Sequence, residues 1–336
     1  MSGDRLVDGY ALVVFDLDGV IYLIDQPIPG AVETVARLHG EGRAVAYATN
    51  NASRRAADVA DLLTGMGVPA RPEEVLTSAA AAAQLLGERL PAGAKVLVVG
   101  AEALRAEISE AGLAGRHRRR GPGRGHPGYG PQVGWADLAE AAVAVRAGAT
   151  WVATNTDRTL PSGRGPLPGN GALVAALATA LGRDPDEIVG KPAPELFATA
   201  ARRADGGRTV VVGDRLDTDI EGANRAGLDS LLVLTGVSDA AELLAAPAER
   251  RPTYVSWDLT GLFDADGVVR VPAPDADHGG WQVSTGTDEW RLSGSGRALD
   301  ALAALCAAAW RGHRAGPVRP ASPAAGQALE RLGLVS

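Results

Sequence analysis

The 336-residue sequence predicts an α/β protein in which a parallel-sheet core carries an inserted second α/β unit and a small C-terminal module. Three observations support this prediction. Short apolar runs rich in valine alternate with stretches of helical periodicity, as in right-handed β-α-β units. Four of these runs end in polar residues, as strands do where an open sheet binds its ligand. From about residue 271 the pattern changes to a Pro- and Gly-rich linker, a hairpin and one helix.

The first part of the core is predicted from two strand and helix pairs near the N-terminus. The apolar run 11–15 is typical of a buried strand, and helical periodicity follows over 31–39 before two glycines stop it. A second apolar run at 44–48 leads into a polar segment and then a helix over 54–66. Ser53 is the residue type that caps such a helix. Strand, helix, strand, helix indicates parallel pairing.

The core resumes after a long insertion. A helix is predicted over 195–203, followed by a strand at 209–212, a helix that stops at Gly227, and a strand at 229–234. The insertion has its own helices and strands, so it is predicted to be a separate α/β cap. The predicted domains are the core at 1–78 and 184–265, the cap at 79–183 and the C-terminal module at 271–336.

Composition excludes several classes of protein. The formal charge of −7 and pI near 5.3 argue against a general nucleic-acid binder. The only cysteine, Cys306, rules out an internal disulfide framework and lies in an Ala-rich helical pattern, where a buried small hydrophobe is the expected role. No apolar run is long enough to span a membrane and no export signal is visible. A cytoplasmic protein is therefore expected.

Acidic side chains at two strand ends predict phosphoryl-transfer chemistry. Asp16 is placed to attack phosphorus and form an aspartyl-phosphate, while Asp18 protonates the leaving alkoxide and then activates water. Asp214 follows a distant strand and completes an oxygen-rich Mg²⁺ site with Asp16 and Asp18. Asp219 is expected to support that site from behind its ligands. A solvated turn is the alternative for any one of these acids.

Neutral and basic groups are expected to hold the phosphate. Thr49, Asn50 and Asn51 follow the second strand, and Thr49 together with the backbone at Asn50 would bind phosphate oxygens. Lys191, before a Pro-x-Pro segment, would offset negative charge on the nucleophile and the phosphate. The alternatives are a helix-entry role for Thr49 and a solvated amine for Lys191. Asp217 is interpreted as the N-cap of the helix that follows.

In this order, four segments resemble the four signature motifs of the haloacid dehalogenase superfamily. These segments are 16–20, 49–51, 190–192 and 213–219. The large insertion between the second and third resembles subfamily IIA, the p-nitrophenylphosphatase-like and nucleotide-phosphatase-like enzymes with an α/β cap. The resemblance covers roughly 10–260. It implies a Rossmann-like core and a Mg²⁺-dependent phosphatase acting through Asp16, with the main-chain carbonyl of Asp18 and Asp214 as further metal ligands.

The resemblance also bears on the substrate, a small phosphorylated metabolite. The composition of the chain and its C-terminal tail resemble those of the actinobacterial glycerol 3-phosphate phosphatases. The tail of those enzymes is distantly acetyltransferase-like. In this chain the Gly-rich segment 293–297 is only a weak candidate for a phosphate-binding loop, so a non-catalytic module is expected. The family's cap loop falls on 153–158 and implies substrate contact by Asn155 or Asp157. The alternative substrates are pyridoxal phosphate, phosphoglycolate and nucleoside monophosphates. The alternative functions are a phosphotransferase and a catalytically impaired scaffold protein. Homo-oligomers formed through the cap are also possible.

The segment 115–128 departs from the family pattern. It is rich in Arg, His and Gly where the cap of the family leads toward another strand. One interpretation is a basic patch for nucleic acid or phosphate, and another is a solvated loop. A third is a local frameshift, because GC-rich codons for 115–126 read one base later can encode an acidic loop followed by an apolar strand. The frameshift is the favoured hypothesis.

Overall fold

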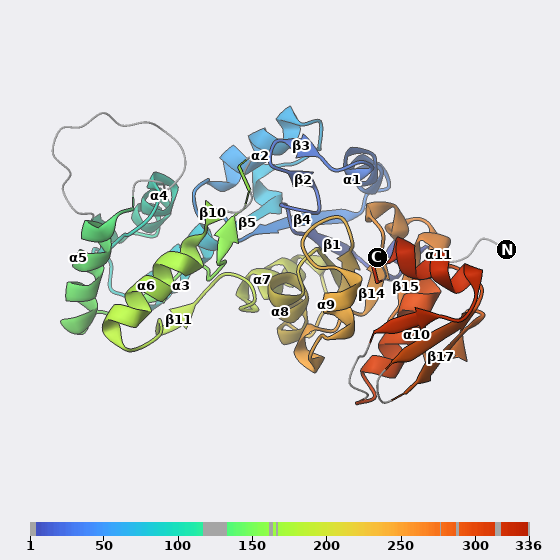
Figure 1. The fold of residues 1–336 in the computed structure, drawn as a ribbon. Helices are drawn as coiled ribbons and strands as arrows, with labels where there is room; N and C mark the ends of the chain where they lie inside the picture. The colour runs from blue at the N-terminus through green and yellow to red at the C-terminus, as the bar shows by residue number, and fades with distance from the viewer. Residues whose placement is uncertain are drawn as a thin grey trace. The chain divides into compact units, whose positions relative to one another are not determined.

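The computed structural model describes residues 5–116, 133–160, 164–165, 167–275, 277–286, 289–312 and 317–334. The chain forms two compact units (Figure 1). Unit 1 contains residues 1–23, 27–45 and 201–336, and unit 2 contains 24–26 and 46–200. Of the unusual segment 115–128, only Gly115 and Arg116 lie within the described residues, so the frameshift hypothesis stays a prediction.

Unit 1 is built on a sheet whose strands run in the order β15-β14-β13-β12-β1. The strands are β1 (Leu12–Phe15), β12 (Thr209–Gly213), β13 (Asp229–Val233), β14 (Tyr254–Ser256) and β15 (Val268–Arg270). All neighbours pair in parallel except β14 with β15. Every residue of β1 and β12 is buried, because helices cover a sheet of this kind on both faces. The predicted parallel core is confirmed.

Around this sheet, unit 1 contains α1 (Ala31–Gly40), α8 (Glu221–Arg225) and α9 (Ala240–Leu244). The first two follow the predicted pattern with one difference. The helix expected after β12 begins with a wider π turn, Leu216–Ile220, before α8. Such turns are uncommon and tend to occur at functional sites. This one carries Asp219, so the helix is irregular where it presents an acid.

The longer segment of unit 2 starts within β4 (Ala44–Thr49), which pairs in parallel with β5 (Val75–Thr77). Helix α2 (Ala56–Gly65) connects them. The prediction that Ser53 caps this helix is wrong. The Ser53 hydroxyl donates to Asn51 Oδ1 at 2.6 Å, while the helix starts after Arg55, whose N–H is accepted by the Asp58 carboxylate at 3.0 Å. The polar segment after β4 therefore forms its own turn before the helix.

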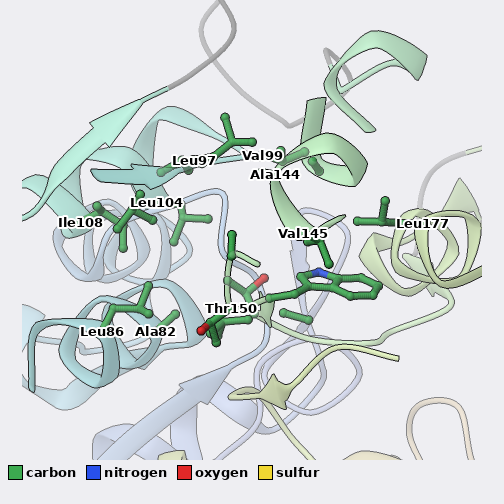
Figure 2. Close-up of a pocket in the computed structure, with 18 of the residues that line it drawn as sticks. Ala82, Leu86, Leu97, Val99, Leu104, Ile108, Ala144, Val145, Thr150 and Leu177 are labelled. Carbon is green, nitrogen blue, oxygen red and sulfur yellow. The ribbon is translucent and has the colours of Figure 1, made fainter. Parts of the chain in front are cut away.

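The rest of unit 2 is the inserted α/β segment and the chain that leads back from it. Its helices are α3 (Ser78–Arg89), α4 (Glu102–Glu110), α5 (Trp135–Arg146), α6 (Asn170–Leu181) and α7 (Glu195–Ala201). Its strands pair in twos: β6 (Lys95–Leu97) with β7 (Ala114–Arg116), β8 (Val152–Ala153) with β11 (Glu187–Ile188), and β9 (Thr159–Leu160) with β10 (Leu167–Pro168). An apolar cavity of about 480 Å³ lies here. Figure 2 shows some of the side chains that line it, such as Leu97, Ile108, Val145 and Leu177.

The C-terminal module belongs to unit 1. A sheet in the order β16-β17-β18-β19 contains the predicted hairpin, and the last pair of strands is parallel. The elements are β16 (Asp277–His278), β17 (Trp281–Thr285), β18 (Trp290–Gly294), β19 (Val318–Pro320), α10 (Ala298–Ala309) and α11 (Pro323–Arg331).

Helix α10 is the centre of this module and is buried along its whole length. It packs in one hydrophobic cluster with core residues such as Leu216, Leu243 and Val255. Cys306 is fully buried within it, and this burial raises the pKa of its thiol. The module and the core of unit 1 therefore share one hydrophobic interior. In the described part of the chain, no helix combines the length and the hydropathy of a membrane span.

Candidate active site

Three aspartates from two distant segments of the sequence meet in unit 1. Asp16 follows β1, Asp214 follows β12, and Asp219 lies in the π turn. Each offers a carboxylate oxygen within 4.8 Å of the others, and all three residues are buried, with Asp16 the most accessible at 7%. The Asp16 N–H donates to the Val212 carbonyl at 2.9 Å, so the two strand ends lie side by side. The predicted meeting of the strand ends is thus observed for Asp16 and Asp214.

Glycines make room for this acid cluster. A Cβ atom at Gly236 would lie 1.9 Å from Asp214 Oδ2, and one at Gly19 would lie 2.4 Å from the same oxygen. A Cβ at Gly213 would lie 2.2 Å from the Asp219 Cβ. Side chains at these three positions would displace the carboxylates. Glycine is therefore required here for close packing.

Backbone groups orient the two buried acids. The Val237 N–H donates to Asp214 Oδ2 at 2.7 Å, and the Arg215 N–H donates to Asp219 Oδ2 at 3.2 Å. The Thr235 hydroxyl donates to the Gly19 carbonyl at 2.7 Å. This bond ties the loop after β13 to the loop that carries Asp16. The strand ends are thereby held in one arrangement before any ligand binds.

The donor set fits a hard divalent cation. Like charges 4.8 Å apart repel by about 3 kcal/mol per pair at an effective dielectric constant of about 20, so three buried carboxylates favour a bound cation. Magnesium prefers such oxygen ligands and keeps several waters. Asp16, Asp214 and Asp219 could hold it. Sequence reasoning gave Asp219 only a supporting role, because its register in the π turn was not visible.

Asp18 lies outside the acid cluster as defined over the described residues. Its side chain is partly exposed, and the Tyr22 hydroxyl donates to Asp18 Oδ2 at 3.5 Å. The Gly19 N–H donates to the Tyr22 carbonyl at 2.8 Å, which closes a tight loop. A partly exposed carboxyl near the acid cluster suits an acid and base better than a ligand.

Asp217 does not cap the helix, contrary to the sequence interpretation. Its carboxylate accepts two hydrogen bonds from the Arg215 guanidinium, at 3.1 and 3.0 Å. The residue before the π turn is Arg215, and its side chain makes no capping bond. Asp217 is instead inside the turn and balances the charge of Arg215. The ion pair with Arg215, two residues earlier, therefore explains the position of Asp217 that we had interpreted as a helix cap.

The predicted phosphate-binding residues lie in unit 2. Thr49 ends β4 and is buried, and its hydroxyl oxygen accepts the Asn51 N–H at 3.1 Å. Lys191 is 3% exposed, and its ammonium lies 5.9 Å from the centre of the Phe197 ring. The Asn50 amide donates to the Lys191 carbonyl at 3.0 Å. Asn50 thus links the end of β4 to the loop that carries the lysine.

The two candidate residues of the cap loop join the same network. The Asn155 side chain donates to the Asn50 carbonyl at 2.7 Å, and its oxygen accepts the Asp157 N–H at 3.2 Å. Asp157 Oδ1 accepts a hydrogen bond from the Asn50 amide at 3.0 Å. The structure therefore brings Asn50, Asn155, Asp157 and Lys191 together. Nothing in the local sequence signals these contacts of Asn50 with partners that lie 105 to 141 residues away.

Comparisons with known proteins agree with this geometry. A family model described as haloacid dehalogenase-like hydrolase matches residues 13–114, and a related HAD-hydrolase-like model matches 188–262. Residues 278–334 match a GCN5-related N-acetyltransferase like domain.

Two relatives match most of the length of the chain. A D-glycerol 3-phosphate phosphatase of Mycobacterium tuberculosis is 48% identical over 82% of this chain and 76% of its own length. An acid sugar phosphatase of Staphylococcus aureus is 35% identical over 74% of this chain and 95% of its own. The chain therefore belongs to the haloacid dehalogenase-like hydrolase family, within subfamily IIA.

Solved structures show the same architecture. The crystal structure of a glycerol phosphate phosphatase from M. tuberculosis in complex with magnesium has a TM-score of 0.86 at 43% identity, covering 99% of this chain and 100% of that one. A 4-nitrophenylphosphatase from Thermotoga maritima has a TM-score of 0.67 at 30% identity, covering 77% of this chain and 98% of its own. The predicted fold, a parallel core sheet with an inserted cap and an acetyltransferase-like C-terminal module, is confirmed.

Proposed function

We propose that the protein is a Mg²⁺-dependent phosphatase that hydrolyses glycerol 3-phosphate through an aspartyl-phosphate on Asp16. The observation that carries this proposal is the buried cluster of Asp16, Asp214 and Asp219 at the carboxyl ends of parallel strands. Family membership and the 48% identical glycerol 3-phosphate phosphatase support the reaction and the substrate.

The reaction takes two displacements at phosphorus. An Asp16 oxygen attacks the phosphorus atom, the bond to the glycerol oxygen breaks, and the Asp18 carboxylic acid protonates that leaving oxygen. Asp18, now ionised, takes a proton from water, and the resulting hydroxide attacks the aspartyl-phosphate. Phosphate leaves and the Asp16 carboxylate is regenerated. Bound Mg²⁺ offsets the negative charge of the phosphoryl oxygens and the carboxylates, held by Asp16, Asp214, the Asp18 carbonyl and, on the geometry, Asp219.

Four further residues are proposed to hold the phosphoryl group. Thr49, the backbone of Asn50, and Asn51 would donate to its oxygens, and Lys191 would balance its charge. The free hydroxyl hydrogen of Thr49 supports this assignment, since its oxygen already accepts the Asn51 N–H. The proposed domains remain a core at 1–78 and 184–265, a cap at 79–183 and a C-terminal module at 271–336 without catalytic groups.

The setting of the protein is also proposed. A lone buried cysteine suits a reducing, cytoplasmic compartment. Association of copies through the cap is supported by α5, on which Trp135 is 83% exposed and Val143 is also exposed, since large apolar side chains are enriched at interfaces. Size-exclusion chromatography of wild type and Trp135→Ser would test it. A wild-type protein that elutes as a monomer would remove the proposal.

Phosphate release from purified protein tests the function. We expect turnover of glycerol 3-phosphate that requires Mg²⁺, stops on chelation and is lost in Asp16→Asn, which keeps the shape of the side chain without its nucleophilic charge. Pyridoxal phosphate, phosphoglycolate, nucleoside monophosphates and p-nitrophenyl phosphate serve as comparison substrates. A higher kcat/KM for any of the first three would overturn the substrate assignment. No release from any substrate by folded protein would favour the impaired scaffold.

A further inference from the structure

We propose that Asn155 and Asp157 are positioning residues that hold the phosphate-binding loops in place, and that they do not bind the substrate themselves. This inference rests on the proposed function and concerns the same site. It replaces the substrate contact that the family resemblance implies for the cap loop. The argument uses hydrogen bonds that lie within unit 2.

The Asn50 carbonyl is held from two sides. The Asn155 amide and the Ser78 hydroxyl each donate to it at 2.7 Å. A peptide unit is planar, so a fixed carbonyl also fixes the N–H of the next residue, Asn51. That N–H donates to Thr49 Oγ1. Asn155 therefore sets the orientation of the Thr49 hydroxyl through one peptide plane, and leaves its hydrogen available for a phosphate oxygen.

Asp157 acts on the other half of the network. Asp157 Oδ1 and the Lys191 carbonyl each accept a hydrogen bond at 3.0 Å from the Asn50 amide nitrogen. Both N–H groups of that amide are thereby used, which leaves the Asn50 side chain no donor for phosphate. Its role is to fix the backbone from which the Lys191 side chain starts. Asp157 keeps the amide in this orientation.

The packing around Gly190 shows that the loops cannot slide independently. A Cβ atom there would lie 2.3 Å from the Thr154 carbonyl oxygen, 2.6 Å from Asn50 Oδ1 and 3.1 Å from the Asn155 Cβ. Asn155 and Asn50 are both buried, and the Asn170 amide donates to the Asn155 carbonyl at 2.7 Å. Three loops thus meet closely around Gly190.

Two substrates with different leaving groups separate positioning from substrate contact. For Asn155→Ala we expect kcat/KM to fall roughly 10- to 100-fold, by the same factor for glycerol 3-phosphate and p-nitrophenyl phosphate, because a buried acceptor loses its donor in both cases. The affinity for inorganic phosphate in the presence of Mg²⁺, measured by calorimetry, should fall as well. A residue that touches only the glycerol would lower glycerol 3-phosphate turnover alone.

Conservative variants and a matched control complete the test. Asp157→Asn keeps an oxygen acceptor for the Asn50 amide and should stay within a few-fold of wild type, whereas Asp157→Ala should lose at least about 10-fold. Asn224→Ala is the control, since the Asn224 amide also bridges two carbonyls, of Glu249 and Arg251, but lies in unit 1. It should leave turnover and phosphate affinity unchanged. Mg²⁺ affinity should be unchanged in every variant, which shows that each is folded.

Three results would overturn the inference. They are a loss confined to glycerol 3-phosphate, wild-type phosphate affinity in Asn155→Ala, and an equal loss in Asp157→Asn and Asp157→Ala. If Asn155→Ala also loses Mg²⁺ binding, the comparison of Asp157→Asn with Asp157→Ala decides whether the inference holds. A wild-type protein that binds phosphate but hydrolyses neither substrate would refute the proposed function, while the phosphate-binding comparison would still decide the inference.

Discussion

Replacing Gly236 by alanine should weaken metal binding by displacing one ligand. An added Cβ would lie 1.9 Å from Asp214 Oδ2, and real Cβ contacts essentially never fall below 3.0 Å, so the carboxylate must move by more than 1 Å. The same oxygen also lies close to Gly19, where an added Cβ would be 2.4 Å from it. The displaced carboxylate would also lose the Val237 N–H.

The expected cost is a 10- to 100-fold rise in the Mg²⁺ concentration that gives half-maximal activity, the range typical when groups that orient a metal ligand are removed. The assay is phosphate release from glycerol 3-phosphate across a Mg²⁺ titration, with circular dichroism to show that the variant is folded. The KM for glycerol 3-phosphate at saturating Mg²⁺ should change little. Gly40→Ala is the matched control, since Gly40 ends α1 and no atom lies within 4 Å of its added Cβ.

Wild-type Mg²⁺ dependence in folded Gly236→Ala would refute the reasoning, because it would mean that the Asp214 carboxylate does not set metal affinity. Thr235→Val gives a second reading that adds no atoms near the acid. It removes the hydroxyl bond to the Gly19 carbonyl, and a smaller rise of a few-fold is expected. A Mg²⁺ concentration for half-maximal activity that is unchanged in both variants would place the cation elsewhere.

Three further outcomes are expected. Mg²⁺ should stabilise the fold, because it relieves repulsion among buried carboxylates. At roughly 100 times Kd the free energy of unfolding should rise by about 2.7 kcal/mol, which raises the melting temperature relative to a sample in EDTA. Identical melting curves would contradict this. Leu302→Ala in α10 should cost about 2–5 kcal/mol in a urea titration, against less than about 0.5 for the exposed Val143→Ala, and equal costs would show that α10 is not part of the core. Burial raises the pKa of the Cys306 thiol in the folded protein, so this thiol ionises at lower pH in the unfolded chain. Its contribution to the stability of the folded state is therefore complete below about pH 8.5 and declines as pH rises above that value. Native protein should therefore resist thiol labelling at pH 9, and labelling as fast as in urea would disprove burial.

The elements that depend on local periodicity were predictable from sequence. The helix expected over 170–181 is α6, and the strand expected over 209–212 is β12 extended by one residue. The meeting of Asp16 with Asp214 also followed, because parallel strands bring their carboxyl ends to one edge. These inferences need only short-range patterns and a rule of topology.

What sequence could not supply depends on contacts between distant segments. The need for glycine at 236 comes from Asp214, a residue 22 positions earlier that packs against it only after β13 forms. Ser53 does not cap α2, since the helix begins only after Arg55 while the Ser53 hydroxyl donates to Asn51, and the Asp217 carboxylate pairs with Arg215. The link from Asn50 to Lys191 joins two loops separated by most of unit 2. Competition among partners decides such positions, and one residue's propensity does not reveal the winner.

The burial of α10 has a consequence for how the protein is made. The N-terminal part of a chain leaves the ribosome first. The strands that precede Asp16 and Asp214 therefore emerge well before α10, the helix that completes their hydrophobic interior. Until about residue 310 has been synthesised, apolar side chains such as Leu243 and Val255 lack their covering. We expect a message that ends near residue 270 to yield a product removed by proteases rather than a smaller enzyme. Pulse-chase decay of that product against the full chain would show it, and equal lifetimes would contradict it.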